Sequence, residues 1–292
     1  MNIQDFKYYH ELVNQKSYTK TAKKFGVSQP TITAAIKRLE NSFNAKFLIR
    51  DQSHKSIIIT KVGMQFDEHV QSILNEINVA ETEIRQSTGA EISFGLPPII
   101  GRNYFPSLVS ELLDAGILRH LNVVERGSYD LEQMLQSGSV NIALLGQTST
   151  SSTSADIDFH LIKRFPMKII VAKDNPLAQK DAIYFKELAN ENFIGLNSDY
   201  IHTRALDYLL DKNKISLNTI YRSPDVLVVK DLVAKNIGFS YLTSLSIRPS
   251  DNVVSIPLKD DNQPEFILVA AKRKSYLMTE QEKNLWNILT QH

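Results

Sequence analysis

The chain has 292 residues and a net charge of +1, and hydrophobic residues make up 42 % of it. These values are typical of a globular protein of one to three domains with a substantial core. The sequence has no apolar run of membrane-spanning length, no apolar leader and no cysteine, so we expect no membrane span, secretory signal, disulfide or thiolate chemistry, and a cytoplasmic location.

The charge is unevenly distributed along the chain. Residues 1–61 contain 11 Lys or Arg against 4 Asp or Glu, whereas residues 62–292 contain 22 against 28. A basic segment on a mildly acidic body is typical of a phosphate-binding module joined to a domain of another kind. The distribution therefore indicates nucleic-acid binding by the N-terminal segment.

The N-terminal segment has the pattern of a helix over 2–15 and two helices within 17–40, joined by a turn at Gly26. Ser28 is the expected N-cap of the last helix, with Pro30 in its first turn. A stripe at steps of three and four is predicted to be buried: Ile32, Ala35, Ile36, Leu39 and Phe43. The residues left for solvent suit a DNA major groove: Gln29, Thr31, Thr33, Ala34, Lys37 and Arg38. The alternative is a small helical bundle with a cationic, solvated face.

Residues 46–60 have the pattern of a β-hairpin with a polar tip at 51–55. Arg50, Ser53 and Lys55 on such a wing are expected to reach the DNA backbone or the minor groove.

A long helix is predicted over 61–87, with Thr60 as its N-cap. Its apolar positions follow the steps of a heptad seam: Phe66, Val70, Ile73, Ile77, Ala80 and Ile84. A single helix cannot bury such a stripe against itself, so we expect a homodimeric coiled-coil contact. The alternative is packing against the first helix of the same chain.

Beyond a hinge at 88–90, short apolar runs alternate with helical patterns, which predicts α/β layers with parallel strands. Strands are expected at 92–96, 121–125, 140–145, 159–164, 168–172, 193–195, 219–222, 239–242, 253–257 and 266–271. Helices are expected at 105–115, 131–137, 185–189, 202–211, 226–234 and 280–290.

The sequence lacks the motifs GxGxxG, Walker A, HExxH and GxSxG. Its seven histidines contain no i, i+4 pair, and no cysteine is available as a metal ligand. We therefore expect no metal site and no cofactor, and we predict that the protein is not an enzyme.

The N-terminal features resemble the winged helix-turn-helix of LysR-type transcriptional regulators. The similar segments are Ser17-Tyr18-Thr19, Thr21-Ala22, Val27-Ser28-Gln29-Pro30, Thr31-Ile32-Thr33, Ile36-Lys37-Arg38-Leu39-Glu40, Phe47-Leu48-Ile49-Arg50 and Ile59-Thr60-Lys61-Val62-Gly63. The resemblance implies a bacterial transcription factor that binds double-stranded DNA at an interrupted inverted repeat, as a homodimer or a dimer of dimers (a homotetramer). The implied DNA-binding residues are Thr19, Ser28, Gln29, Pro30, Thr31, Thr33, Lys37, Arg38, Arg50, Ser53 and Lys55, and the implied dimerisation residues are Phe66, Val70, Ile73, Ile77 and Ile84.

The rest of the chain resembles the effector domain of the same family, which has two α/β lobes like a small periplasmic binding protein. The similar segments are Gly95 to Gly101, Glu125 to Ser128, Asn141 to Leu144, Asp174 to Ala178 and Leu232 to Phe239. The implied fold combines α+β and α/β parts: a winged helix-turn-helix at 1–60, a linker helix at 61–88 and an effector-binding domain at 91–292. Lobe one is expected at 91–164 and 265–292, and lobe two at 165–264.

A small-molecule effector is implied between the lobes, where helix N-termini favour a carboxylate. The implied residues are Pro97, Pro98, Ile99, Ile100, Gly101, Gly127, Ser128, Gln147, Asn197, Ser198, Thr203, Pro224 and Asp225, with Arg102 and Arg204 as the nearest cations. Many family members have Ser or Thr within 97–100, and its absence here argues against the usual carboxylate contact. Similarity at 8–10 and 50–55 to regulators of malolactic fermentation makes L-malate a candidate. The alternative is a ligand-independent architectural DNA-binding protein, which needs no cleft.

Overall fold

The structure is a computed structural model that describes residues 2–50, 57–87, 91–148, 154–198 and 200–291. The chain separates into two compact units, Met1–Arg85 and Gln86–His292. The first unit holds the predicted helices and wing, and the second holds the alternating strands and helices.

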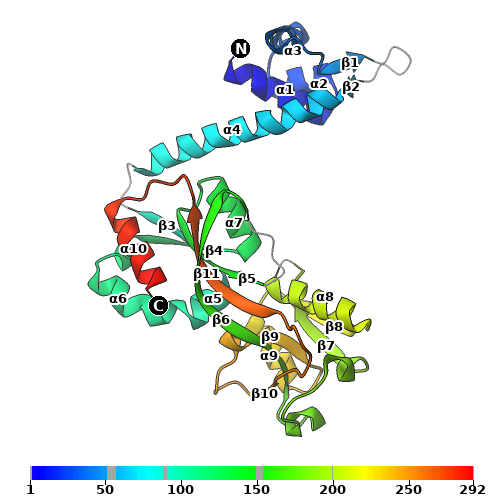
Figure 1. The fold of residues 1–292 in the computed structure, drawn as a ribbon, viewed down its shortest axis with the longest axis vertical. Coiled ribbons are helices and arrows are strands. Elements are labelled where there is room, and N and C mark those ends of the chain that lie inside the picture. Colours follow the sequence, from blue (N-terminus) through cyan, green and yellow to red (C-terminus); the bar gives the residue numbers. More distant parts are fainter. Residues whose placement is uncertain (1, 51–56, 88–90, 149–153, 199, 292) are drawn as a thin grey trace. The chain divides into compact units, whose positions relative to one another are not determined.

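The first unit consists of three helices, a two-stranded wing and a long helix (Figure 1). Its elements are α1 (Ile3–Gln15), α2 (Tyr18–Phe25), α3 (Gln29–Phe43), β1 (Leu48–Arg50), β2 (Ile57–Ile59) and α4 (Lys61–Ser87). The two strands pair antiparallel. The core forms where the apolar stripes of α1 and α3 meet, around Tyr9, Leu12, Ile32 and Leu39, each with an exposed fraction of 0 %.

The predicted buried stripe of α3 is correct at four positions and wrong at Phe43. Ile32, Ala35, Ile36 and Leu39 are buried, whereas Phe43 is 48 % exposed. Phe43 lies in the last turn of α3, where its ring packs against Phe47 and Phe66. It therefore borders the core instead of entering it.

The seam predicted on α4 is divided between two environments. Val70 is fully buried and Phe66 is partly buried, because both pack into the core formed by α1 and α3. For both residues the alternative of packing within the same chain is correct; the assignment of Val70 to a dimer contact is wrong, and that of the partly buried Phe66 stays a prediction. Ile73 is 40 % exposed and Ile84 is 68 % exposed, so the second half of the helix retains an apolar stripe.

The second unit is built on a mixed sheet with the strand order β10-β6-β11-β5-β3-β4, in which β9 also pairs with β6. A separate parallel pair is formed by β7 and β8. The strands are β3 (Ile92–Leu96), β4 (Leu121–Glu125), β5 (Ile142–Gln147), β6 (Ile157–Ala172), β7 (Asn192–Leu196), β8 (Asn218–Ser223), β9 (Ser240–Thr243), β10 (Val253–Ile256) and β11 (Glu265–Arg273).

The helices of this unit cover both faces of the sheets (Figure 1). They are α5 (Pro98–Asn103), α6 (Val109–Asp114), α7 (Ser128–Gln136), α8 (Ile201–Asn213), α9 (Val226–Ala234) and α10 (Glu280–Thr290). Single 3₁₀ turns lie at Phe105–Leu108, Leu118–His120, Pro176–Gln179, Phe185–Leu188 and Ser244–Ser246.

Two features of the sheet differ from the sequence-based expectation. The strands predicted at 159–164 and 168–172 are one 16-residue strand, β6. At Pro166 this strand does not turn; it exchanges its partner β11 for β9 and β10. The parallel prediction holds for β3 with β4 and β5, whereas β11 is antiparallel to both β5 and β6 because it returns from the far end of the unit.

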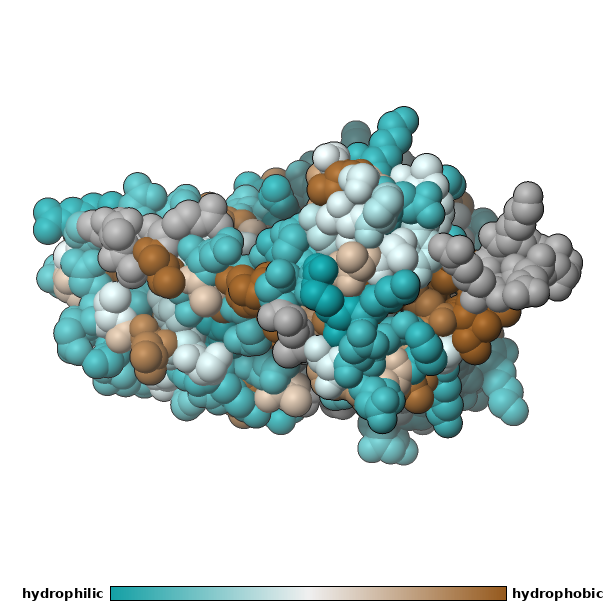
Figure 2. All heavy atoms as spheres, turned by 90° about the horizontal axis from the view of Figure 1, so that it is seen from above, coloured by the Kyte–Doolittle hydropathy of each residue, from teal (hydrophilic) through white to brown (hydrophobic). Residues whose placement is uncertain are grey.

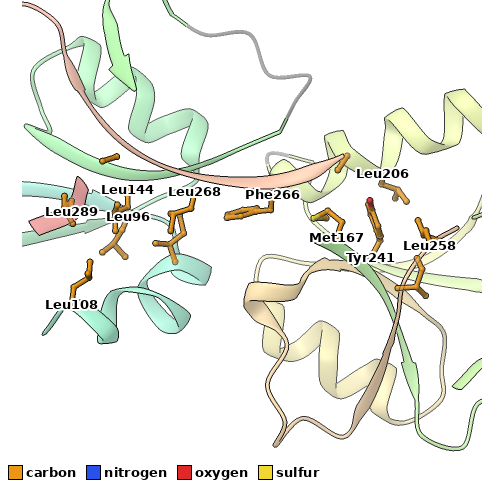
Figure 3. Close-up of a cluster of buried hydrophobic side chains, with 14 of the residues drawn as sticks. Leu96, Leu108, Leu144, Met167, Leu206, Tyr241, Leu258, Phe266, Leu268 and Leu289 are labelled. Atoms are coloured by element: carbon orange, nitrogen blue, oxygen red, sulfur yellow. The ribbon is translucent and has the colours of Figure 1, made fainter. Parts of the chain in front are cut away.

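The long strands β6 and β11 join two lobes. In the first lobe, α7 packs on one face of the sheet through Leu131 and Leu135, while α10 packs on the other face through Leu285 and Leu289. In the second lobe, α8 and α9 contribute to separate buried clusters. Figure 3 shows Phe266 on β11 between the buried side chains of the two lobes. Phe266 therefore lies at the inner end of the space between the two lobes.

Candidate functional site

The helix-turn-helix is defined by side-chain caps and one left-handed glycine. Ser17 accepts a hydrogen bond from the backbone N–H of Lys20 and begins α2. Gly26 ends α2 with φ +65°, a conformation that glycine adopts without strain. Ser28 then begins α3 by accepting a hydrogen bond from the Thr31 N–H at 3.3 Å. These local signals position α3 as predicted.

The polar side chains on the outward face of α3 differ in their exposure and in whether they form hydrogen bonds within the helix. Gln29, Pro30, Thr31 and Lys37 are exposed, as is Thr19 on α2. The Thr31 hydroxyl lies 2.9 Å from the Ser28 hydroxyl. In the next turn, the Thr33 hydroxyl donates to the Gln29 carbonyl at 3.1 Å, and Thr33 is half-buried. The Gln29 amide is therefore the better candidate to read a base edge, because Thr33 uses its proton within the helix.

The acidic side chains of residues 2–50 are buried and paired. Asp5 bonds Arg38, Glu11 bonds Lys24, and Glu40 bonds Lys46. Their exposed fractions are 1 %, 7 % and 7 %. Because these carboxylates face inward, the charges left at the surface of residues 2–50 are cationic, as a phosphate-binding surface requires.

Arg38 differs in role from its neighbour Lys37. Its guanidinium donates two hydrogen bonds to the Asp5 carboxylate, at 2.5 and 3.1 Å. Its charge thus neutralises a buried carboxylate that joins α1 to α3, and its expected contact with DNA phosphate stays a prediction. Lys37 is exposed and retains the predicted role.

The wing is described only in part. Arg50 is the last residue of β1, and Ser53 and Lys55 lie outside the described residues. Their expected DNA contacts stay predictions.

A cleft of ≈ 460 Å³ opens between the two lobes of the second unit. Its wall contains five of the predicted effector residues, Arg102, which was predicted as a nearby cation, and three residues that were not predicted. The predicted effector residues are Pro98, Ile99, Gly101, Pro224 and Asp225, and the residues that were not predicted are Glu125, Tyr200 and Val226. A volume in this range accommodates a small organic ligand.

A smaller recess of ≈ 20 Å³ adjoins this cleft, because Ile99 and Tyr200 line both. The Tyr200 hydroxyl donates to the Pro224 carbonyl at 2.6 Å, which holds the ring between the two spaces. The recess is lined by Pro97, Ile99, Gly127, Ser128, Tyr200, Ile201, His202 and Phe266. The Ser128 hydroxyl accepts a hydrogen bond from the Gly146 N–H at 2.9 Å, so its own proton is left to donate.

Five predicted effector residues do not line either space. Ile100 is fully buried in the core, and Gln147, Asn197 and Ser198 lie outside both linings. The Thr203 hydroxyl donates to the Asn197 carbonyl at 2.8 Å and serves the loop instead. Arg204 lies over the Tyr129 ring, 5.7 Å from its centroid, and not in the cleft. These residues were placed by chain order, which does not define the direction of a side chain.

Sequence reasoning missed Tyr200, Ile201, His202 and Phe266. A signal for His202 was present, since it shares a helical stripe with Ala205, Leu206 and Leu209, all buried. The stripe predicted a buried histidine at the start of α8, where a strand-to-helix loop enters the cleft.

The described part of the chain contains neither a membrane-spanning helix nor a candidate metal site. None of its helices is long and apolar enough to cross a membrane. In the same ranges, His, Asp and Glu side chains form no group of three that suits a metal ion. The face of the molecule in Figure 2 is mostly hydrophilic, with hydrophobic side chains in separate groups.

The chain matches two family models over most of its length. Residues 3–64 match the bacterial regulatory helix-turn-helix protein of the lysR family, and residues 85–292 match the LysR substrate binding domain. The first range lies within the unit that carries α3, and the second covers the unit that contains the cleft.

Relatives and solved structures agree with this assignment. The malolactic fermentation system transcriptional activator of Lactococcus lactis is 31 % identical over 99 % of this chain and 98 % of its own. The dual regulator OxyR of Escherichia coli is 24 % identical over 88 % and 85 %. The effector binding domain of QuiR in complex with shikimate is similar in fold, with a TM-score of 0.61 at 18 % identity over 69 % of this chain and 95 % of that one. HinK of Pseudomonas aeruginosa has a TM-score of 0.58 at 21 % identity over 99 % and 97 %. The chain belongs to the LysR family: it is a LysR-type transcriptional regulator with an effector-binding domain, not an enzyme.

Proposed function

We propose that this regulator is a cytoplasmic homo-oligomer, a dimer or a dimer of dimers, that binds an interrupted inverted repeat in double-stranded DNA and responds to a small organic acid held between its two lobes. The single observation that carries the effector part is the ≈ 460 Å³ cleft bordered by α5, the start of α9 and the loop before α8. An architectural protein that only bends DNA has no use for such a cleft.

The DNA contact is assigned to α3 in the major groove. The exposed Gln29 amide can pair with a base edge, and the exposed Lys37 ammonium can pair with a phosphate. Gln29→Ala is expected to lower discrimination between operator and competitor DNA by about 1–3 kcal/mol. An unchanged operator preference in a gel-shift competition would rule out α3 as the reading helix.

The oligomer contact is assigned to the second half of α4. Ile73, Ile77 and Ile84 follow heptad spacing, and Ile73 and Ile84 are exposed. An exposed apolar stripe on a helix is stabilised when a second helix covers it. The pairing of two heads also supplies the two half-sites that an inverted repeat requires.

The effector is proposed to be a carboxylate. The N-terminal residues of α7 and α8 line the recess, and their free N–H groups and dipoles favour an anion. L-malate is the first acid to test, because the relative at 31 % identity is named for malolactic fermentation. A DNA footprint recorded with and without a panel of organic acids tests the proposal. An unchanged footprint with every acid, combined with full regulation after deletion of residues 91–292, would support the architectural alternative.

A further inference from the structure

Helix α5 joins the two lobes of the second unit, in addition to the strands β6 and β11. By chain order α5 belongs to the first lobe, because it directly follows β3. Its first turn nevertheless packs into the second lobe, since Ile99 is 4 % exposed and lies in a buried cluster with Val226 and Val229 of α9. The helix also contacts the 3₁₀ turn Ser244–Ser246 of the second lobe.

Arg248, in the loop after that 3₁₀ turn, holds the C-terminal end of α5. Its guanidinium donates one hydrogen bond to the Arg102 carbonyl at 2.8 Å and one to the Asn103 side-chain oxygen at 3.0 Å. Carbonyls in the last turn of a helix lack a donor within the helix, so Arg248 pairs with a group that α5 itself leaves free. Asn103 is in turn fixed, because its amide donates to the Ile99 carbonyl at 2.8 Å. Two bonds from one planar guanidinium fix direction as well as distance.

The backbone of Arg248 is anchored to α9 through an ion pair. The Arg248 N–H donates to the Asp251 carboxylate at 2.8 Å, and the Lys230 ammonium donates to the same oxygen at 2.6 Å. Lys230 lies on α9, is 5 % exposed and also donates to the Ser246 carbonyl at 2.9 Å. A buried ammonium requires such partners, so this loop is held in place by a charge inside the second lobe.

These bonds connect two helices that line the cleft. Val226 begins α9, and Pro98 and Ile99 begin α5, and all three line the cleft. A change in the angle between the lobes must therefore either break the bonds of Arg248 to α5 or move α5 together with the second lobe. Arg248 is exposed and can exchange its bonds for water, whereas the buried Lys230 cannot.

We propose that the α5 strap, defined as the side chains of Lys230, Asp251 and Arg248, fixes the angle between the two lobes, and that Arg248 releases α5 when this angle changes. This inference goes beyond the proposed function, because it concerns the ligand-free domain and does not depend on the identity of an effector. Arg204 also joins the lobes, through a cation–π contact with the exposed ring of Tyr129. Such a contact is weaker than two hydrogen bonds from a charged donor.

The angle between the lobes is measured on the full-length protein without ligand. Because the chain has no cysteine, Ser110→Cys on α6 and Asp231→Cys on α9 provide two specific and exposed sites for spin labels, one in each lobe. Labelled chains are exchanged into a large excess of the cysteine-free protein, so that the recorded distances lie within one chain. Pulsed electron paramagnetic resonance then gives the distribution of distances between the lobes.

Three single variants compare the arginines of the second lobe. Arg248→Ala is expected to broaden the distance distribution, because α5 loses its hydrogen bonds to the second lobe. Arg204→Ala is expected to broaden it less. Arg222→Ala is the matched control and is expected to leave it unchanged, since that guanidinium donates to the Leu196 carbonyl within the second lobe. The midpoint of thermal unfolding, followed through the fluorescence of the single tryptophan, Trp286, identifies the variants that fold.

A double variant tests whether the α5 strap acts as a unit. Lys230→Met combined with Asp251→Ala removes the anchor of Arg248 without leaving a buried charge unpaired. This double variant is expected to broaden the distribution, and the further addition of Arg248→Ala is expected to change it little, because residues of one network are not additive.

The inference is overturned if the distribution of Arg248→Ala equals that of the wild type, or if Arg204→Ala or Arg222→Ala broadens it as much. A fully additive effect of Arg248→Ala on the double variant would show that Arg248 acts without the anchor and would also overturn it. Should Arg248→Ala fail to fold, Arg248→Lys decides by the same criteria, because it keeps the charge but loses the planar pair of donors. None of these measurements involves an acid, so their outcome is independent of the footprint that tests the effector.

Discussion

Replacing His202 by leucine is expected to remove a pH-dependent loss of stability from the effector-binding domain. Burial holds the pKa of His202 at about 4 in the folded protein, against an ordinary value of 6.5. As the pH falls below 6.5, the unfolded chain therefore binds a proton that the folded protein excludes. Stability is fully present above pH 6.5 and is lost as the pH falls towards 4.

The magnitude follows from the separation of the two pKa values. At pH 5 the unfolded chain has gained about 2 kcal/mol relative to the folded protein, and near pH 4 about 3 kcal/mol. Because the His202 side chain is almost completely buried, solvent screening reduces this effect little. A loss of this size is a substantial fraction of the stability of a typical domain.

Urea denaturation at pH 7.5 and pH 5, followed through Trp286 fluorescence, measures the effect in the domain that contains His202. Carboxylates and other histidines titrate in wild type and variant alike, so the difference between the two proteins isolates His202. The free energy of unfolding of His202→Leu is expected to fall by about 2 kcal/mol less than that of the wild type. Equal pH dependence of the two proteins would show that the imidazole of the wild type is solvated or paired in solution.

Three further predictions concern the head, the linker helix and the cleft. Arg38→Ala is expected to destabilise the first unit by about 2–3 kcal/mol, because it leaves the buried Asp5 carboxylate unpaired. Lys37→Ala is expected to leave the melting midpoint unchanged and to reduce the salt dependence of DNA binding by about one charge. Ile73→Asp is expected to halve the mass in light scattering and to weaken operator binding; an unchanged mass would exclude the α4 contact. Ser128→Ala should reduce the footprint response to an effector while Ser198→Ala keeps it, because only Ser128 lines the recess; the reverse result would place the ligand elsewhere.

The secondary structure of the first unit was predictable because the residues that define its helix ends lie close to those ends in the sequence. The Ser28 cap, the Gly26 turn and the bounds of α4 all follow from residues within one helical turn of the feature that they define. Phe43 and Val70 were assigned wrongly for a different reason. A stripe of apolar residues defines which side of a helix is buried, but the length over which a neighbouring core covers that stripe depends on tertiary packing.

The cleft was predictable as a location but not as a set of side chains. Chain order correctly brought Pro98, Ile99 and Asp225 to one space, because loops at strand ends meet at one edge of the sheets. It did not show that Thr203 turns back to its own loop or that His202 lines the recess. Those directions depend on how α8 rotates against its sheet, and no short-range pattern defines that rotation.

The lining of the cleft suggests that selection between effectors depends on polar contacts to the ligand more than on the total area of apolar contact. Its inner wall is largely apolar, with Pro97, Ile99 and Phe266 around a single imidazole. Any small acid gains similar apolar contact there, so that contact cannot distinguish a hydroxy acid from its deoxy counterpart. Selection between acids is therefore expected to depend on the polar groups that border the cleft. Among them, the Ser128 hydroxyl accepts a hydrogen bond from the Gly146 N–H and has its own proton left to donate to a ligand oxygen.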